Sequence, residues 1–387
     1  MWPEPAWRLR YRAIAGRGDD CGAMRAALAD SAWHVRLRAA DLVSPACAQD
    51  ARLVATLVDW IDSVPASSRR EPGGVSWHAG ARALTALARV RPAAASRHVR
   101  ALASHDVRHV RRYAARAAAT LGDTAVLRRL ARDRDPNTRE AALDALSALT
   151  GHADDSLFIA ALESNQAQVV RAAASALAGS RHDAARRAAG AAYDRWAGRA
   201  SDSERDVRHA LLAAAGRPAS DDPRPPARTA LPAEAVALAL GADVRLRVTL
   251  ADSSGGGSFV VRLRGDVAPL MAARVLDLAQ EGFYDGLTWH RVDADFVIQG
   301  GSPGENEYVG HHRYFRDELG TVPHLRGTVG MSTRGHDTGD AQWFVNLKDN
   351  LRLGRAFTVF AEVIEGIDVV DGVLEGDVID SIERVAP

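Results

Sequence analysis

A short phrase of the type Val-Arg-x-x-Ala-Ala recurs along residues 1–216 and limits what this region can fold into. Clear copies begin at Val35, Val110 and Val170, and the arginine-equivalent positions of all the copies follow one another at intervals of 28 to 42 residues. Leucine, valine and alanine recur at helical spacing within the copies. One pair of such helices cannot bury its apolar face alone, so neighbouring pairs must stack and share a core. The sequence therefore predicts an all-α stack of helix pairs.

An aspartate or asparagine precedes the arginine of most copies, as Asp30, Asp106 and Asp135 do. These residues suit a helix N-cap or a turn before the second helix of a pair. We expect the repeated arginines to pair with aspartates along the stack. The phrase and its spacing resemble HEAT repeats, and this resemblance implies an α-solenoid that offers a platform to a protein partner. Nucleic acid is the less favoured partner, because the arginines have acidic neighbours.

The formal net charge of the chain is zero, but the two parts of the chain carry opposite charges. Residues 243–387 contain 14 basic and 23 acidic side chains, a net charge of −9, and residues 1–242 carry the balancing +9. This division predicts either docking between the two parts or a basic face for an acidic partner. An ordinary solvated surface is an alternative of equal weight.

Cys21 and Cys47 are the only cysteines, and they form neither a disulfide framework nor a metal-ligand spacing. We therefore expect two small, buried apolar side chains. No apolar run typical of a signal peptide or a membrane span occurs, which predicts a cytoplasmic protein without membrane contact. The chain starts close to its first repeat, so a preceding export signal and a location in the cell envelope remain an alternative. Lys348 is the only lysine among many arginines, which is typical of a GC-rich bacterial genome.

A proline-rich segment ends the repeats. Five prolines fall within Arg217–Pro232. Proline interrupts helices and favours an extended, semi-rigid spacer. We predict a linker over residues 217–239, between the α-solenoid of residues 1–216 and a second domain over residues 240–387.

The hydrophobic period changes to two after the linker. Alternation over residues 244–250 and 259–263 predicts a β-hairpin. Pro269 is expected to open a helix that ends at Gln280, before Gly282. The spacing of strands and turns predicts a mainly-β, closed antiparallel barrel. Further short strands are expected at residues 288–292, 296–299, 328–331, 342–346 and 358–363.

Several segments of this second domain resemble, in the right order, the signature of the cyclophilin-type peptidyl-prolyl cis/trans isomerases. The resemblance implies a closed eight-stranded barrel with two helices that isomerises Xaa-Pro bonds in proline-containing polypeptides. It implies no cofactor and no metal. The matching segments are Gly282–Val292, Phe296–Gly301, Arg326–Ser332, Asp340–Asn346 and Phe357–Phe360.

The resemblance also implies roles for individual residues. Arg291 matches the catalytic arginine, Gln299 matches the residue that orients its guanidinium, and Phe296 stands with them. A cationic donor near the prolyl amide stabilises the twisted state in which resonance is lost, and an apolar pocket holds the ring. The residues expected to bind the substrate are Val297, Ser332, Thr333, Gln342, Phe344, Leu353 and Phe357.

Two departures from the family pattern concern the rim of the pocket. Arg352 stands where many relatives carry an aromatic residue, and residues 302–310 lack the usual glycine-rich loop. We therefore expect a different specificity pocket. These departures leave a second hypothesis open, a non-catalytic scaffold that binds proline-containing peptides. The intact Arg291 and Gln299 favour the first hypothesis, an isomerase that assists protein folding.

Overall fold

The computed structural model describes residues 2–66, 76–199, 201–222 and 233–386, which form two compact units. The helical unit comprises Pro5–Gly198 and Val207–Asp221. The strand-rich unit comprises Met1–Glu4, Arg199–Asp206 and Asp222–Pro387. The start of the chain and one short segment near residue 200 therefore belong to the strand-rich unit. None of the described helices is long and apolar enough to cross a membrane.

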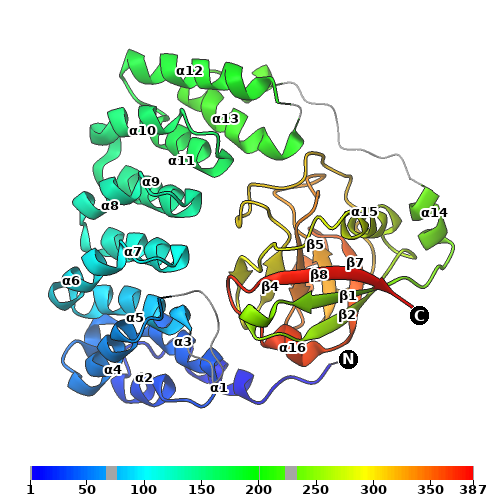
Figure 1. Ribbon diagram of the computed structural model, residues 1–387, viewed down its shortest axis with the longest axis horizontal. Helices are drawn as coiled ribbons and strands as arrows, with labels where there is room; N and C mark the ends of the chain where they lie inside the picture. Colours follow the sequence, from blue (N-terminus) through cyan, green and yellow to red (C-terminus); the bar gives the residue numbers. More distant parts are fainter. Residues whose placement is uncertain (1, 67–75, 200, 223–232, 387) are drawn as a thin grey trace. The chain divides into compact units, whose positions relative to one another are not determined.

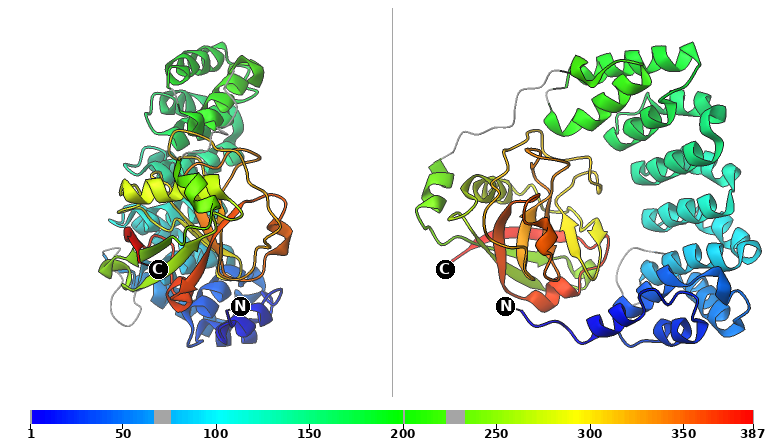
Figure 2. Two further views of the ribbon diagram at one scale, coloured as in Figure 1. Left: turned by 90° about the vertical axis from the view of Figure 1, so that its right-hand side faces the viewer. Right: turned by 180° about the vertical axis from the view of Figure 1, so that it is seen from behind.

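Helices stack in successive layers in the N-terminal region (Figures 1 and 2), which confirms the predicted all-α stack. Alternate helices α3, α5, α7, α9 and α11 contact one another in that order. The paired alanines of the three clear copies of the repeated phrase are fully buried, so these helices approach closely. The helices are α1 (Trp7–Ala13), α2 (Cys21–Leu28), α3 (Trp33–Leu42), α4 (Ala51–Asp62), α5 (Trp77–Val90), α6 (Pro92–Leu102), α7 (Arg108–Leu121), α8 (Thr124–Leu130), α9 (Pro136–Thr150), α10 (Asp155–Ala161), α11 (Ala167–Leu177), α12 (Asp183–Ala197) and α13 (Arg205–Ala214).

The predicted roles of acidic side chains hold for part of the repeats: Arg111 and Arg171 pair with carboxylates, whereas Arg36 donates to the backbone carbonyls of Asp30 and Ser31. The Asp135 side chain accepts a hydrogen bond from the Thr138 amide and caps α9. The buried guanidinium of Arg111 donates two hydrogen bonds of 2.8 Å to the Asp133 carboxylate. Arg171 pairs instead with a glutamate, Glu140, at 2.6 Å. The guanidinium groups of Arg111 and Arg171 are therefore engaged by acidic side chains within the stack.

The expectation that the two cysteines are separate buried thiols is wrong. Cys21 opens α2, Cys47 ends the short 3-10 helix η1 (Pro45–Cys47), and the two form a disulfide with a Cα–Cα distance of 5.4 Å. The two residues are 26 positions apart in the sequence, so only the fold of the first repeat brings them together. The bond closes a loop that contains the whole of α3.

Replacing both cysteines by alanine is expected to lower the free energy of unfolding of the helical unit by about 3 kcal/mol, because the unfolded chain regains the entropy of an open loop of this length. Hydrogen exchange of the amides of α2, α3 and α4, measured by mass spectrometry, reports the change for the helical unit alone. Wild-type protein treated with a reductant serves as the control and should shift by a similar amount. Identical curves for oxidised, reduced and substituted protein would contradict the disulfide.

The predicted linker over residues 217–239 is described only at its two ends. A short 3-10 helix, η4 (Ala219–Asp221), follows the last repeat. Helix α14 (Ala233–Ala239) contributes Ala235 and Leu238 to the core of the strand-rich unit, so this end of the predicted linker is part of a folded unit. Four of the five prolines fall within residues 223–232, outside the described residues, and the extended spacer stays a prediction.

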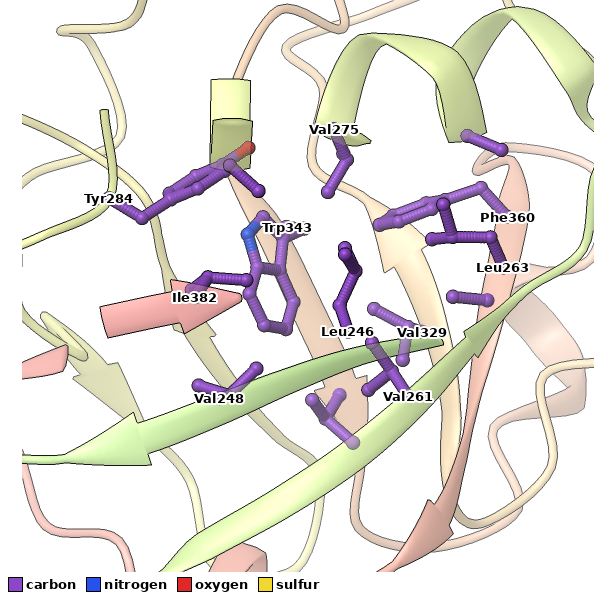
Figure 3. Close-up of a cluster of buried hydrophobic side chains, with 14 of the residues drawn as sticks. Leu246, Val248, Val261, Leu263, Val275, Tyr284, Val329, Trp343, Phe360 and Ile382 are labelled. Atoms are coloured by element: carbon purple, nitrogen blue, oxygen red, sulfur yellow. The ribbon is translucent and has the colours of Figure 1, made fainter. Parts of the chain in front are cut away.

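Eight strands of the strand-rich unit form one antiparallel sheet in the order β3-β4-β6-β5-β7-β2-β1-β8. Helices α15 (Pro269–Gln280) and α16 (Ile367–Asp371) accompany it. Large apolar side chains such as Trp343, Phe360 and Tyr284 fill the curl of the sheet (Figure 3). The strands are β1 (Arg245–Leu250), β2 (Ser258–Leu263), β3 (Arg291–Val292), β4 (Val297–Gly300), β5 (Thr328–Met331), β6 (Trp343–Asn346), β7 (Val359–Glu365) and β8 (Ile379–Val385).

The expectation of eight strands agrees with this unit. Helices α15 and α16 correspond to the two expected helices and α14 adds a third, but the expected closed barrel is wrong. The sheet is curled, and no ladder joins its edge strands β3 and β8. One isolated bridge, between Thr288 and Val378, connects the segments that precede these strands. The physical reason is the length of β3, which has two residues and uses them to pair with β4. Closure of a sheet needs an edge strand that pairs on both sides.

Candidate active site

A cavity opens beside strands β3, β4 and β6 of the strand-rich unit. One of its walls is apolar, and charged and polar side chains form the rest. Nine of the ten residues singled out in the sequence line it, and the tenth, Gln342, lies behind it. The lining residues are Arg291, Phe296, Val297, Gln299, Glu307, Ser332, Thr333, Arg334, Phe344, Leu353 and Phe357.

The apolar wall is a separate small cluster. Val297, Phe344 and Leu353 are buried, and Phe296 and Phe357 pack against them. The rings of Phe344 and Phe357 meet edge to face at 5.6 Å. Gly330 on β5 lies opposite Phe344, and a Cβ atom there would come within 2.4 Å of the ring, so glycine leaves the space that this ring needs. The wall has the size and apolar character that suit a pyrrolidine ring.

Arg291 brings a positive charge to the edge of this wall. Strands β3 and β4 pair so that Arg291 lies directly opposite Gln299. Its Nη1 lies 3.4 Å from the Gln299 Oε1 and 2.9 Å from the Glu307 Oε1. The Arg291 side chain is 45% exposed, so the guanidinium is held by the protein and still reachable from solvent. Its centre lies 5.9 Å from the Phe296 ring centroid.

Gln299 is the inner anchor of the site. Its amide Nε2 donates to the Ser332 Oγ at 3.0 Å and to the Gln342 Oε1 at 3.2 Å. The carboxamide oxygen is therefore turned toward Arg291. Gln342 in turn donates to the carbonyls of Asn306 and Val309. The amide of Gln342 thus holds the loop that carries Glu307, and its role in binding the substrate backbone stays a prediction.

Two lining residues were not predicted from the sequence, Glu307 and Arg334. Arg334 follows the predicted Ser332 and Thr333, and its guanidinium donates to the Glu307 carbonyl, the Asp206 carboxylate and, at 2.8 Å, the Tyr314 hydroxyl. Burial raises the pKa of Tyr314 to about 12, so this hydroxyl remains protonated. The guanidinium of Arg334 thus stabilises the edge of the cavity through these hydrogen bonds. No local sequence pattern marks either residue.

Arg352 explains one departure from the family pattern. Its guanidinium lies over the Phe296 ring, 4.8 Å from the centroid. A stacked arginine covers part of an aromatic face and interacts with its electrons. Arg352 therefore stacks on Phe296 and covers one face of its ring. The arginine takes the place of the aromatic residue that many relatives carry at this position.

The chemistry available here is donation of hydrogen bonds from a cation beside an apolar cavity. Arg291 offers this donation, and Gln299 limits the positions that the guanidinium can adopt. Among the described residues, no group of three or more histidine, cysteine, aspartate or glutamate side chains has a geometry that could hold a metal ion. The geometry suits the polarisation or twisting of an uncharged group, such as an amide, next to a small apolar ring.

Comparison with known proteins agrees with this geometry. Residues 247–385 match the family described as cyclophilin type peptidyl-prolyl cis-trans isomerase, and residues 101–178 match HEAT repeats. A peptidyl-prolyl cis-trans isomerase of Helicobacter pylori is 37% identical over 130 residues, which are 33% of this chain and 80% of that protein. Isomerase B of Bacillus subtilis is 35% identical over 33% of this chain and 90% of its own length, and isomerase B of Escherichia coli is 35% identical over 30% and 77%.

The chain belongs to the cyclophilin-type peptidyl-prolyl cis-trans isomerases and carries HEAT repeats ahead of the isomerase domain. The two resemblances read from the sequence are thereby confirmed. The peptidyl-prolyl isomerase activity follows from the family and from its relatives. The roles of the individual site residues remain predictions that the geometry supports.

Proposed function

We propose that the strand-rich unit isomerises Xaa-Pro bonds of protein clients and so assists their folding, and that Arg291 is its central catalytic residue. The observation that carries this proposal is the placement of the Arg291 guanidinium at the edge of the apolar cavity, next to Gln299. A client prolyl ring would occupy the wall formed by Phe344, Leu353 and Phe357. The backbone beside the ring would lie along Ser332 and Thr333.

The catalytic step in this proposal is rotation about one amide bond. Amide resonance sets a barrier of about 18–20 kcal/mol for this rotation, and the resonance is lost when the bond is twisted. The prolyl nitrogen then regains its lone pair, to which the guanidinium can donate a hydrogen bond. Because this interaction is stronger in the twisted state than in either planar state, it lowers the barrier. The apolar wall holds the ring while the preceding residue turns.

The helical unit supplies a second element of the proposal, a platform for a client or a protein partner. A partner that is bound to a tethered platform reaches the isomerase site at a raised effective concentration. The pairing of Arg111 and Arg171 with acidic side chains of the stack supports a protein partner over nucleic acid. Bacterial relatives and the arginine-rich composition support a bacterial origin.

The proposed location follows from the Cys21–Cys47 disulfide. Disulfides persist in oxidising compartments and are rare in the cytosol. The disulfide therefore supports the cell envelope, the alternative raised by the sequence, over the cytoplasmic default.

The decisive experiment compares catalysis with binding. The full chain is added to an Ala-Ala-Pro-Phe tetrapeptide, and cis/trans exchange is followed by NMR. An enzyme speeds exchange at concentrations far below that of the peptide. A binding module shifts the peptide signals but does not speed exchange, which keeps its uncatalysed time of tens to hundreds of seconds. This second outcome would favour the scaffold hypothesis.

A further inference from the structure

We propose that Glu307 makes this isomerase selective for prolines that have a cationic side chain close by in the sequence, and that it disfavours acidic neighbours. This inference rests on the proposed function of the same cavity. Glu307 belongs to the loop of residues 302–310 that departs from the family pattern. Among the described residues that line the cavity, Glu307 is the single acidic one.

The Glu307 carboxylate is accessible to a bound peptide. Its Oε1 lies 2.9 Å from the Arg291 Nη1, and its side chain is 48% exposed. It therefore stands at the mouth of the cavity, in contact with the catalytic guanidinium on one side and with solvent on the other. A side chain that leaves the peptide near the prolyl ring would therefore meet this carboxylate as the acidic group of the described lining.

The loop that carries Glu307 is held in place by residues of the site. Gln342 donates to the carbonyls of Asn306 and Val309 at 3.1 and 2.9 Å. The Asn306 side chain accepts hydrogen bonds from the amides of Tyr308 and Val309, and Arg334 donates to the Glu307 carbonyl. The carboxylate is thus positioned before a substrate arrives, and a charge in a fixed position discriminates better than a mobile one.

The other charges of the cavity decide the sign of the preference. Arg334 is engaged with Asp206 and Tyr314, and Arg352 is stacked on Phe296 outside the lining. A cationic peptide side chain beside Glu307 takes over as its partner, and Arg291 is then free to donate to the amide. An acidic side chain meets repulsion from Glu307 and competes with it for Arg291, which removes the guanidinium from the amide. Complementary charge of this kind sets specificity more than overall affinity.

The test compares peptides within one enzyme. Tetra- to hexapeptides with one proline carry lysine, glutamine or glutamate at each of the three positions before it and the two after it. At the position that lies against Glu307, the full chain is expected to give a kcat/KM ratio of lysine to glutamate peptide of about 10, as a half-exposed ion pair gained and a repulsion avoided would produce. The ratio should shrink in high salt.

Variants separate selectivity from a merely structural role. Glu307→Gln should reduce the lysine-to-glutamate ratio to nearly 1, and Glu307→Lys should invert it. A structural role would change all peptides by the same factor and leave the ratio untouched. Glu305→Gln is the matched control, because it removes the same charge from the same loop at a position outside the lining, and it should retain the wild-type ratio.

The outcomes for this inference and for the proposed function can be told apart. If the glutamine peptides are isomerised but the lysine and glutamate peptides have equal kcat/KM at every position, the inference about Glu307 is wrong. The proposed isomerase function is then retained. An unchanged ratio in Glu307→Gln overturns it as well. If no peptide is isomerised, the proposed function is wrong, and the ratio of dissociation constants for the same peptides decides whether Glu307 selects cations.

Discussion

An Arg291→Ala variant is expected to lose about 10²–10³-fold in kcat/KM, the cost of removing one pre-positioned hydrogen-bond donor from a transition state. The residue does not support the core, since its side chain is 45% exposed and its strand β3 has two residues at the edge of the sheet. The loss should therefore fall on the rate, and the fold should remain. Peptide exchange by NMR or a protease-coupled assay measures the rate, and circular dichroism checks the fold.

Two further variants test whether geometry or charge is lost. Arg291→Lys keeps the positive charge but lacks the planar, multiple donors, and we expect it to recover only a small part of the rate. Arg247→Ala removes an exposed arginine from β1, outside the cavity, and is the matched control that should stay near the wild-type rate. Arg291→Ala activity within a few-fold of wild type would show that another group supplies the stabilisation.

Local patterns in the sequence predicted parts of the fold. The alternation of β1 and the partial alternation of β2 predicted both strands to within a residue, and the helix expected at Pro269–Gln280 is α15. Strand β8 was not predicted from any pattern. Its buried residues Ile379 and Ile382 are three positions apart, because the register with β1 shifts there and breaks the period of two.

The central strands of the sheet lack the alternating pattern that marks β1. All four residues of β4, of β5 and of β6 are buried, so none of these strands alternates between a polar and an apolar face. The spacing of strands and turns predicted these short strands, but only the likeness to a known family identified their site residues. The way in which the ends of the sheet meet was also not predictable, because strand length decides closure and the sequence does not fix the length of β3.

The residues that were not predicted from the sequence share one property. The partner of each is distant in the sequence, and the fold brings the two together. Glu307 meets Arg291 across 16 positions, through a loop held by Gln342 and Arg334. Cys21 and Cys47 are 26 positions apart and form a disulfide across the segment that contains α3. Neither composition nor local spacing predicts such long-range contacts, because they depend on the positions of the surrounding helices and strands. Glu307, Cys21 and Cys47 are therefore the features of this chain that were hardest to predict from its sequence.

Breaking the ion pair between Arg326 and Asp371 is expected to destabilise the strand-rich unit by about 3–5 kcal/mol. The Arg326 side chain is 3% exposed and that of Asp371 is 11% exposed. Arg326 donates to both carboxylate oxygens of Asp371 and, at 2.8 Å, to the Leu347 carbonyl. Asp371→Ala would leave the guanidinium buried with its main counter-charge removed, which costs more than the pair itself contributes.

Hydrogen exchange measured by mass spectrometry is the suitable readout, because the chain has two units and a single unfolding curve would mix them. Amides of β5, β6 and β7 should exchange about 10²–10⁴-fold faster in Asp371→Ala, and those of the helical unit should not change. Asp368→Ala, an exposed aspartate of the same helix α16, is the control and should have little effect.

A double variant decides between the loss of a favourable contact and the burial of an uncompensated charge. In Arg326→Met with Asp371→Leu, no charge is left unpaired, so most of the lost protection in β5 should return. The carbonyls of Leu347 and Pro3 then each lose a donor. If the double variant exchanges as fast as Asp371→Ala, the pair itself stabilises the unit. Strand β5 leads directly into Ser332 and Thr333, so in that case the ion pair at its start also supports the geometry of the site.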